Sequence, residues 1–180
     1  MRRIDQSDFI IHFTKGKTNN SSEQGYENFK KILADGKLIG GNFMIRGEYK
    51  CVCFTESPIR CLVQGKNSSK NYLEEKYFQR YRPFGFQFSK KHIHQMGGRQ
   101  VIYSTDNEYL SLPENFKWRF MHHEHYIDGK NSIDFTWERE WRLKEKLIFN
   151  NKEVNLVFPN RFWIDRFITI LRYGEFKLSD

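Results

Sequence analysis

Apolar and polar residues in the first part of the chain predict a strand, a helix and a second strand. β-Branched and aromatic residues dominate 9–14 (FIIHFT) and 50–55 (KCVCFT), which indicates two short buried strands. Between them, apolar residues recur at helical spacing from 26 to 33, and Gly36 is a typical helix terminator. We therefore expect the chain to begin as strand, helix and strand.

The middle of the chain mixes short strands with helices. Ser-Pro at 57–58 predicts that the second strand runs into a helix, because Ser caps helices and Pro suits the first helical position. Residues 67–82 have the composition of an exposed amphipathic helix or a mobile basic segment. Alternation at 83–88 indicates a strand, a short helix is expected to end at 97–98, and 100–103 indicates another strand.

The last part of the chain predicts further short elements. We expect a helix over 114–126 and a strand pair over 135–148. A strand is expected over 154–158, and 162–171 fits a helix or a strand. Short strands without regular strand–helix alternation predict an α+β fold with mainly antiparallel pairing. The length of 180 residues fits a single domain over 1–180.

Composition narrows the class of protein. The chain has 30 Lys and Arg against 22 Asp and Glu, a net charge of +8, which favours an anionic partner such as a nucleotide or nucleic acid. Aromatic residues make up 17% of the chain, enough for a packed core, so a disordered basic tail is excluded. Neither of the two common glycine-rich nucleotide-binding loops is present.

The sequence also indicates a compartment. It has no apolar run long enough to span a bilayer and no signal-peptide pattern, so we expect a cytoplasmic protein with no membrane partner. The three cysteines, Cys51, Cys53 and Cys61, are clustered and odd in number, which fits a reducing compartment. Cys51 and Cys53 alternate along a strand and lack C-x-x-C spacing, so buried thiols are expected rather than zinc ligands.

Two glutamates form the sharpest local motif, T-W-E-R-E-W-R. On an extended strand Glu138 and Glu140 would share a face, about 7 Å apart along the chain. Carboxylates beside a sugar can stabilise an oxocarbenium-like transition state, so one could hold a donor sugar and the other orient an acceptor. The alternative is a solvated strand face on which both glutamates form salt bridges with neighbours such as Arg142.

An early histidine and threonine form a second candidate pair. His12 and Thr14 would share one face of the first strand and could hydrogen-bond a ribose and a carboxamide. The alternative is a histidine with a purely structural hydrogen bond.

Two further clusters have competing interpretations. His122 and His125 would share a helical face and could hold a divalent metal in a metal-dependent nuclease, but they lack H-E-x-x-H spacing, so we expect no metal. Lys76, Arg80 and Arg82 lie among tyrosines, an arrangement that suits single-stranded nucleic acid. The alternative for these cations is a solvated helix.

Several motifs in order resemble the AbiGi-type abortive-infection proteins and, more distantly, the DarT toxins and the wider ADP-ribosyltransferase fold. The resemblance covers roughly residues 9–145 and rests on I-H-F-T before a helix ending in L-x-x-G, C-F-T-E-S-P, R-P-F-G-F-Q-F-S-K, G-G-R-Q-V-I-Y and T-W-E-R-E-W-R. It implies a split antiparallel β-sandwich with short helices. The chain departs from the DarT pattern at Glu56, where those toxins carry an arginine, and Arg60 and Arg99 are the nearest substitutes.

The resemblance also implies an activity. Proteins of this fold transfer ADP-ribose from NAD to a nucleic-acid or protein acceptor, and a neutralising partner protein is expected for a toxin of phage defence. Glu140 would be the catalytic glutamate and Glu138 would orient the acceptor. The residues implied for NAD binding are His12, Thr14, Thr55, Arg99 and Tyr103, the last stacking on nicotinamide. The alternative is a catalytically inactive antitoxin or a nucleic-acid-binding module of the same fold.

Overall fold

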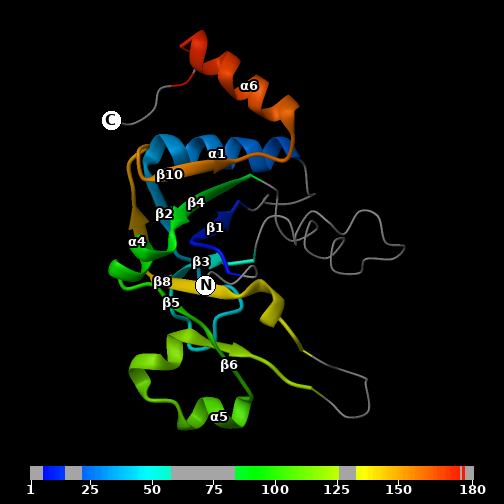
Figure 1. The fold of residues 1–180 in the computed structure, drawn as a ribbon. Coiled ribbons are helices and arrows are strands. Elements are labelled where there is room, and N and C mark those ends of the chain that lie inside the picture. Colours follow the sequence, from blue (N-terminus) through cyan, green and yellow to red (C-terminus); the bar gives the residue numbers. More distant parts are fainter. Residues whose placement is uncertain (1–5, 15–21, 58–83, 126–132, 175, 177–180) are drawn as a thin grey trace, which may run out of the picture.

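The computed structural model describes residues 6–14, 22–57, 84–125, 133–174 and 176, and a six-stranded sheet runs through its centre (Figure 1). The strand order is β10-β4-β1-β3-β8-β5, and every neighbouring pair is antiparallel. These strands are β1 (Phe9–Phe13), β3 (Cys51–Thr55), β4 (Gly85–Ser89), β5 (Arg99–Gln100), β8 (Glu140–Lys144) and β10 (Val154–Val157).

Two small sheets complete the β structure of the described residues. β2 (Lys37–Ile39) pairs antiparallel with β9 (Lys146–Ile148), and β6 (Ile102–Ser104) pairs parallel with β7 (Phe120–His122). The pairing is thus mostly antiparallel, and the prediction of an α+β fold is confirmed.

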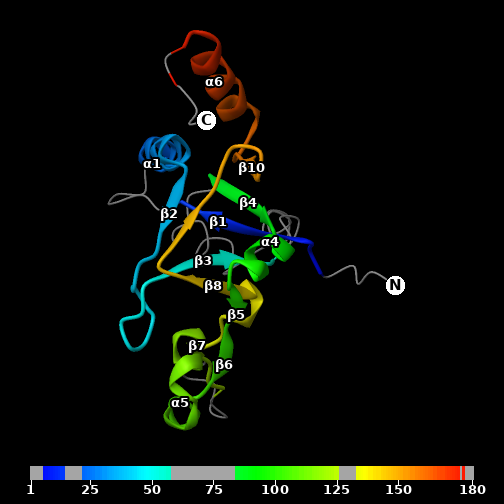
Figure 2. The same cartoon turned by 90° about the vertical axis from the view of Figure 1, so that its left-hand side faces the viewer.

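Helices lie at both ends of this arrangement. Figures 1 and 2 show α1 (Ser22–Asp35) and α6 (Arg161–Arg172) towards one end of the molecule, and α5 (Asp106–Ser111) at the other. α4 (Lys90–Gln95) follows β4, and two 3₁₀ helices are η2 (Glu114–Arg119) and η3 (Thr136–Glu138). Gly36 has φ +58° directly after α1, a left-handed conformation that glycine adopts at little cost, so the predicted helix terminator is confirmed.

The main hydrophobic core lies where α1 and α6 pack against the central sheet. Phe84, Phe86 and Phe88 of β4 and its flank are fully buried there, together with Phe29 of α1 and Phe167 of α6. Aromatic side chains bury large apolar areas, which explains how a strongly charged chain builds this core. The 162–171 segment is a helix, begun by Asn160, whose side chain accepts a hydrogen bond from the Trp163 N–H.

The sheet is continuous on one side of β1 and opens on the other. β1 and β4 pair along all of β1, from Phe9 with Ser89 to Phe13 with Gly85. β1 and β3, both wholly within the described residues, pair only at Ile11 and Thr55. The two strands therefore diverge beyond that pair, which leaves room for a cavity between them.

Three sequence predictions are corrected. Residues 100–103 are not one strand, because β5 joins the central sheet while β6 pairs with β7. The predicted helix over 114–126 is a 3₁₀ helix followed by strand β7, so His122 and His125 do not share a helical face. The predicted strand pair over 135–148 is a 3₁₀ helix followed by two strands that belong to different sheets.

Some predictions lie outside the described residues. These are the helix after Ser57-Pro58, the segment 67–82 with Lys76, Arg80 and Arg82, and the Cys61 thiol. Within the described ranges, no helix is both long enough and apolar enough to cross a membrane.

Candidate functional site

A cavity of about 380 Å³ lies where β1 and β3 diverge. Its wall is formed by β1, β2, β3, β7, β8, η3, α1 and the segment from Gly41 to Ile45. The volume falls within the range of roughly 300–1,000 Å³ that small-molecule pockets occupy. Five of the residues that the sequence nominated for catalysis or NAD binding line it: His12, Thr14, Thr55, Glu138 and Glu140.

The pairing of β3 with β8 decides which side chains share a face. Thr55 pairs with Glu140 and Cys53 pairs with Arg142, so these four side chains lie on one face of the sheet. Phe54 and Trp141, also a pair, point to the opposite face and join the main core. One face of the same two strands is therefore apolar core, while the other lines the cavity.

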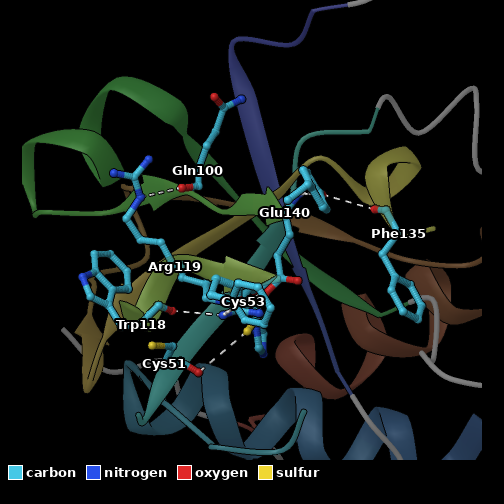
Figure 3. Close-up of polar contacts among 11 residues, drawn as sticks. Cys51, Cys53, Gln100, Trp118, Arg119, Phe135 and Glu140 are labelled. Carbon is cyan, nitrogen blue, oxygen red and sulfur yellow. Dashed lines mark hydrogen bonds and ion pairs between the residues drawn. The ribbon is translucent and has the colours of Figure 1, made fainter. Parts of the chain in front are cut away.

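Glu140 is held at the start of β8 by its own strand and by β6. Its side chain is 6% exposed, and its Oε1 accepts a hydrogen bond of 2.7 Å from Nε of Arg142. Its backbone N–H donates to the hydroxyl of Tyr103 at 3.0 Å. Figure 3 shows the side chain directed towards Cys53, whose thiol pKa is raised by burial and further by the Glu140 carboxylate. Both the backbone and the carboxylate of Glu140 are thus fixed.

Arg142 is the partner that keeps this carboxylate in place. It is 1% exposed, and Nη1 donates to the carbonyl oxygens of Trp118 at 3.0 Å and Phe120 at 2.7 Å. Burial opposes its charge, but attraction and hydrogen bonding to Glu140 outweigh burial and raise the pKa of Arg142. The guanidinium therefore stays charged beside Glu140.

Glu138 reaches the cavity from a turn rather than from a strand. It ends η3, and Arg139 follows with φ +46°, so the two glutamates do not alternate along one strand as predicted. The Thr55 hydroxyl donates to the Glu138 carbonyl oxygen at 2.5 Å and ties this turn to β3. Glu138 is also 6% exposed, so the predicted alternative of a solvated strand face is wrong, although Glu140 does form the salt bridge with Arg142 that this alternative expected.

His12 and Thr14 carry structural hydrogen bonds while lining the cavity. Nδ1 of His12 lies 2.8 Å from the carbonyl oxygen of Cys53, which can only accept, so Nδ1 carries the proton. The bond joins β1 to β3 where their backbone pairing stops. Thr14 is buried, and its hydroxyl is within hydrogen-bond distance of the carbonyl oxygens of Phe84 and Gly25, at 3.1 and 3.3 Å.

Tyr103 and Arg99 are not among the residues that line the cavity. The Tyr103 hydroxyl donates to the carbonyl oxygen of Phe135 at 3.2 Å while accepting from the Glu140 N–H. Burial raises the pKa of Tyr103 to about 12. Nη1 of Arg99 donates to the carbonyl oxygens of His94 and Gly98. Tyr103 therefore supports the cavity from behind, and Arg99 stays on the β5 edge of the sheet.

Sequence reasoning gave no role to the side chain of Glu56. It is 3% exposed, and its carboxylate accepts hydrogen bonds from Lys90 at 2.6 Å, Gln100 at 3.2 Å and Trp141 at 2.8 Å. This glutamate joins β3, α4, β5 and β8 on the face away from the cavity. Its partners come from distant parts of the chain, so no local signal could have identified it.

The remaining candidate clusters do not form a metal site within the described residues. No group of three or more His, Cys, Asp or Glu side chains is placed to hold an ion there. His122 instead pairs with Glu124 at 3.0 Å, and His123 lies 3.7 Å from Asp134. Burial raises the pKa of the Cys51 thiol to about 11, so this thiol remains protonated at neutral pH.

Comparisons with protein-family models, with curated proteins and with solved structures find no match. Function is therefore inferred from the cavity residues. Two buried glutamates, Glu138 and Glu140, lie beside the buried guanidinium of Arg142 in the lining of this cavity. Such an arrangement can stabilise a developing positive charge on a bound sugar, because in a shielded site fixed charges act strongly.

Proposed function

We propose that this chain is an ADP-ribosyltransferase-like enzyme of phage defence or a related toxin. It binds NAD in the cavity and transfers ADP-ribose to a macromolecular acceptor. The observation that carries the proposal is the meeting of His12, Thr14, Thr55, Glu138 and Glu140 around one cavity, although they come from three separate parts of the chain.

The chemistry of the site fits a dissociative transfer. The bond between the nicotinamide nitrogen and C1′ of the ribose breaks, and nicotinamide leaves as a neutral molecule with the bonding electron pair. Glu140, whose Oε1 accepts a hydrogen bond from Arg142, hydrogen-bonds the ribose and stabilises the oxocarbenium-like cation. A lone pair of the acceptor then attacks C1′, and Glu138 accepts the acceptor's proton before losing it to water.

The sheet supports the finer fold proposed here. An ADP-ribosyltransferase-like sandwich is split so that the donor enters between strands, and β1 and β3 diverge after Ile11 and Thr55. His12 on β1 and Glu140 on β8 then face one cavity from the two sides of that opening.

Labelled NAD tests the activity. We expect the wild-type protein to release nicotinamide and to attach adenine-labelled ADP-ribose to a component of a mixture of DNA, RNA and protein. Glu140→Gln should slow nicotinamide release on the order of 10²-fold or more, because a neutral amide cannot balance the cation. The matched control is Glu145→Gln, which removes the same charge from an exposed position directly after β8 and should leave the rate unchanged.

Two results would contradict the proposal. The first is wild-type protein that neither binds nor consumes NAD but binds nucleic acid with strong salt dependence, which would favour the antitoxin or nucleic-acid-binding alternative. The second is equal nicotinamide release by the Glu140→Gln and Glu145→Gln proteins.

A further inference from the structure

The cations around the cavity differ in what they can offer a ligand. Among the described lining residues, the side chains of Arg and Lys are those of Arg142 and Lys31. Arg142 is already engaged by the Glu140 carboxylate and by two backbone carbonyl groups. Lys31 is exposed and forms no ion pair with any residue that the structure describes. Lys31 is therefore the positively charged side chain of the described lining that can bind an anionic group of a ligand.

Helix α1 presents Lys31 to the cavity together with two neighbours. Asn28, Lys31 and Ile32 all line the cavity, and their spacing of three and four residues places them on one face of the helix. The wall formed by α1 thus supplies an ammonium and an amide, whereas the wall formed by β8 and η3 supplies two carboxylates. The cavity has one acidic side and one side suited to an anion.

The mouth of the cavity adds an apolar part. Ile39, Phe43 and Met44 line it and are 66%, 74% and 50% exposed. A cavity lined by exposed apolar side chains and by a cation suits a ligand that carries both phosphate and a flat ring. A nucleotide has both features, while a free phosphate or a simple sugar does not.

We infer that Lys31, with Asn28 beside it, binds the diphosphate of the NAD donor. The inference rests on the proposed function. The ribose that Glu140 would hold is joined through its C5′ to the diphosphate, so a cation in the same cavity is within reach of the phosphate oxygens. Arg99 cannot take this role from the β5 edge, where it is bonded to backbone carbonyl groups.

The chain offers a closely matched control. Lys30 is the preceding residue, pairs with Glu27 at 2.8 Å, lies over the Tyr26 ring and does not line the cavity. Lys31→Ala and Lys30→Ala therefore remove the same charge one residue apart. The affinities of both variants and of wild type for NAD and for ADP-ribose are measured by titration calorimetry at about 0.05 M and about 0.5 M salt.

Lys31→Ala should weaken the binding of NAD and of ADP-ribose about 10-fold or more at low salt, because a charged hydrogen bond to phosphate is lost. The difference from wild type should shrink at high salt, where the ion pair is screened. Lys30→Ala should bind as wild type does, and Lys31→Arg should retain most of the affinity.

Each other outcome has a distinct meaning. If wild type binds neither NAD nor ADP-ribose, the proposed function fails and the inference fails with it. If wild type binds both and the two alanine variants bind equally, the function stands and the assignment of Lys31 is wrong. If Lys31→Ala weakens binding of a DNA or RNA oligonucleotide but not of NAD, Lys31 contacts the acceptor and the inference is overturned. A loss of NAD affinity that is the same at both salt concentrations also overturns it, because the lysine then acts through packing.

Discussion

Two buried carboxylates lie close together on the central sheet and have different surroundings. Glu56 follows Thr55, and Thr55 is the register partner of Glu140. Glu56 contacts the Trp141 indole on the core face, whereas Glu140 shares the cavity face with Thr55. The two residues are about equally shielded, at 3% and 6% exposure. Burial alone therefore does not distinguish them.

The hydrogen bonds of Glu56 and Glu140 distinguish the two residues. Glu56 accepts from Lys90, Gln100 and Trp141, so both of its oxygens are bonded to side chains of three other elements. Glu140 accepts from Arg142 through Oε1 and also hydrogen-bonds the Cys53 thiol, and both Cys53 and Glu140 line the cavity. Glu56 therefore joins structural elements away from the cavity, whereas Glu140 and its partners lie in the cavity wall, where a ligand can reach them.

Removal of the guanidinium from Arg142 should have the largest effect on stability. Arg142→Met leaves the Glu140 carboxylate buried without its cation and leaves two carbonyl groups without their donor. Loss of one member of a buried pair costs about 3–5 kcal/mol, so the free energy of unfolding in urea should fall by that order. The double variant Arg142→Met with Glu140→Gln should recover part of the loss.

A small effect of Arg142→Met on the free energy of unfolding would change how Glu140 compares with Glu56. If the variant loses less than about 1 kcal/mol, which is the range of exposed pairs, then water in the cavity rather than Arg142 solvates Glu140. Arg142→Lys keeps the charge but not the forked geometry, so it provides a second measurement if the methionine variant does not fold.

Glu56→Gln should have a smaller effect and should act on stability alone. An amide has one oxygen and one NH₂ group, so one of the three donors around Glu56 would face another donor. The expected loss is about 1–3 kcal/mol, read as a lower melting temperature. NAD consumption per folded molecule should stay at the wild-type level. The control is Glu48→Gln at an exposed position; reduced turnover in correctly folded Glu56→Gln protein would contradict the structural role.

The elements that sequence could predict are those whose signals are local. The strand at 9–13 and the strand at 51–55 are short β-branched and aromatic runs, and Gly36 ends α1 at the predicted place. Cavity residues on these elements, such as His12 and Thr55, could be nominated because each lies on a well-predicted strand. That they meet depends on the order of β1, β3 and β8 in the sheet, which no local pattern encodes.

Predictions failed where distant pairing decides the structure. Phe120 and Met121 are consecutive and both buried, a pattern that suits a helix as well as a strand, and pairing of β7 with β6 decides for the strand. Alternation predicted Glu138 on a strand, but the left-handed backbone at Arg139 ends a 3₁₀ helix there. The sequence suggested a surface charge at Arg142, because two of its three partners, the carbonyl groups of Trp118 and Phe120, belong to a distant segment of the chain.

Tyr103→Phe should have the smallest effect and tests how Glu140 is held. The hydroxyl joins the Glu140 N–H to the Phe135 carbonyl group, so its loss should cost on the order of 1 kcal/mol at neutral pH. Because the backbone of Glu140 and the turn that carries Glu138 both lose a tether, kcat for NAD consumption should fall more than the affinity for NAD. An unchanged kcat would show that Arg142 alone is sufficient to position Glu140.

The stability of Tyr103→Phe at alkaline pH provides a second test of this hydroxyl. Burial raises the pKa of Tyr103 from its ordinary value of 10.0 to about 12, so the folded state holds this proton more tightly than the unfolded chain. The resulting stabilisation is complete below about pH 10 and is lost as the pH rises towards 12. The difference corresponds to an upper limit of about 2.7 kcal/mol, which solvent screening reduces to on the order of 1 kcal/mol. The free energy of unfolding of Tyr103→Phe should therefore fall less over this pH interval than that of wild type. The control is Tyr173→Phe, at an exposed position, which should lose as much as wild type. Equal alkaline losses in all three proteins would show that the Tyr103 hydroxyl is not shielded in the folded state.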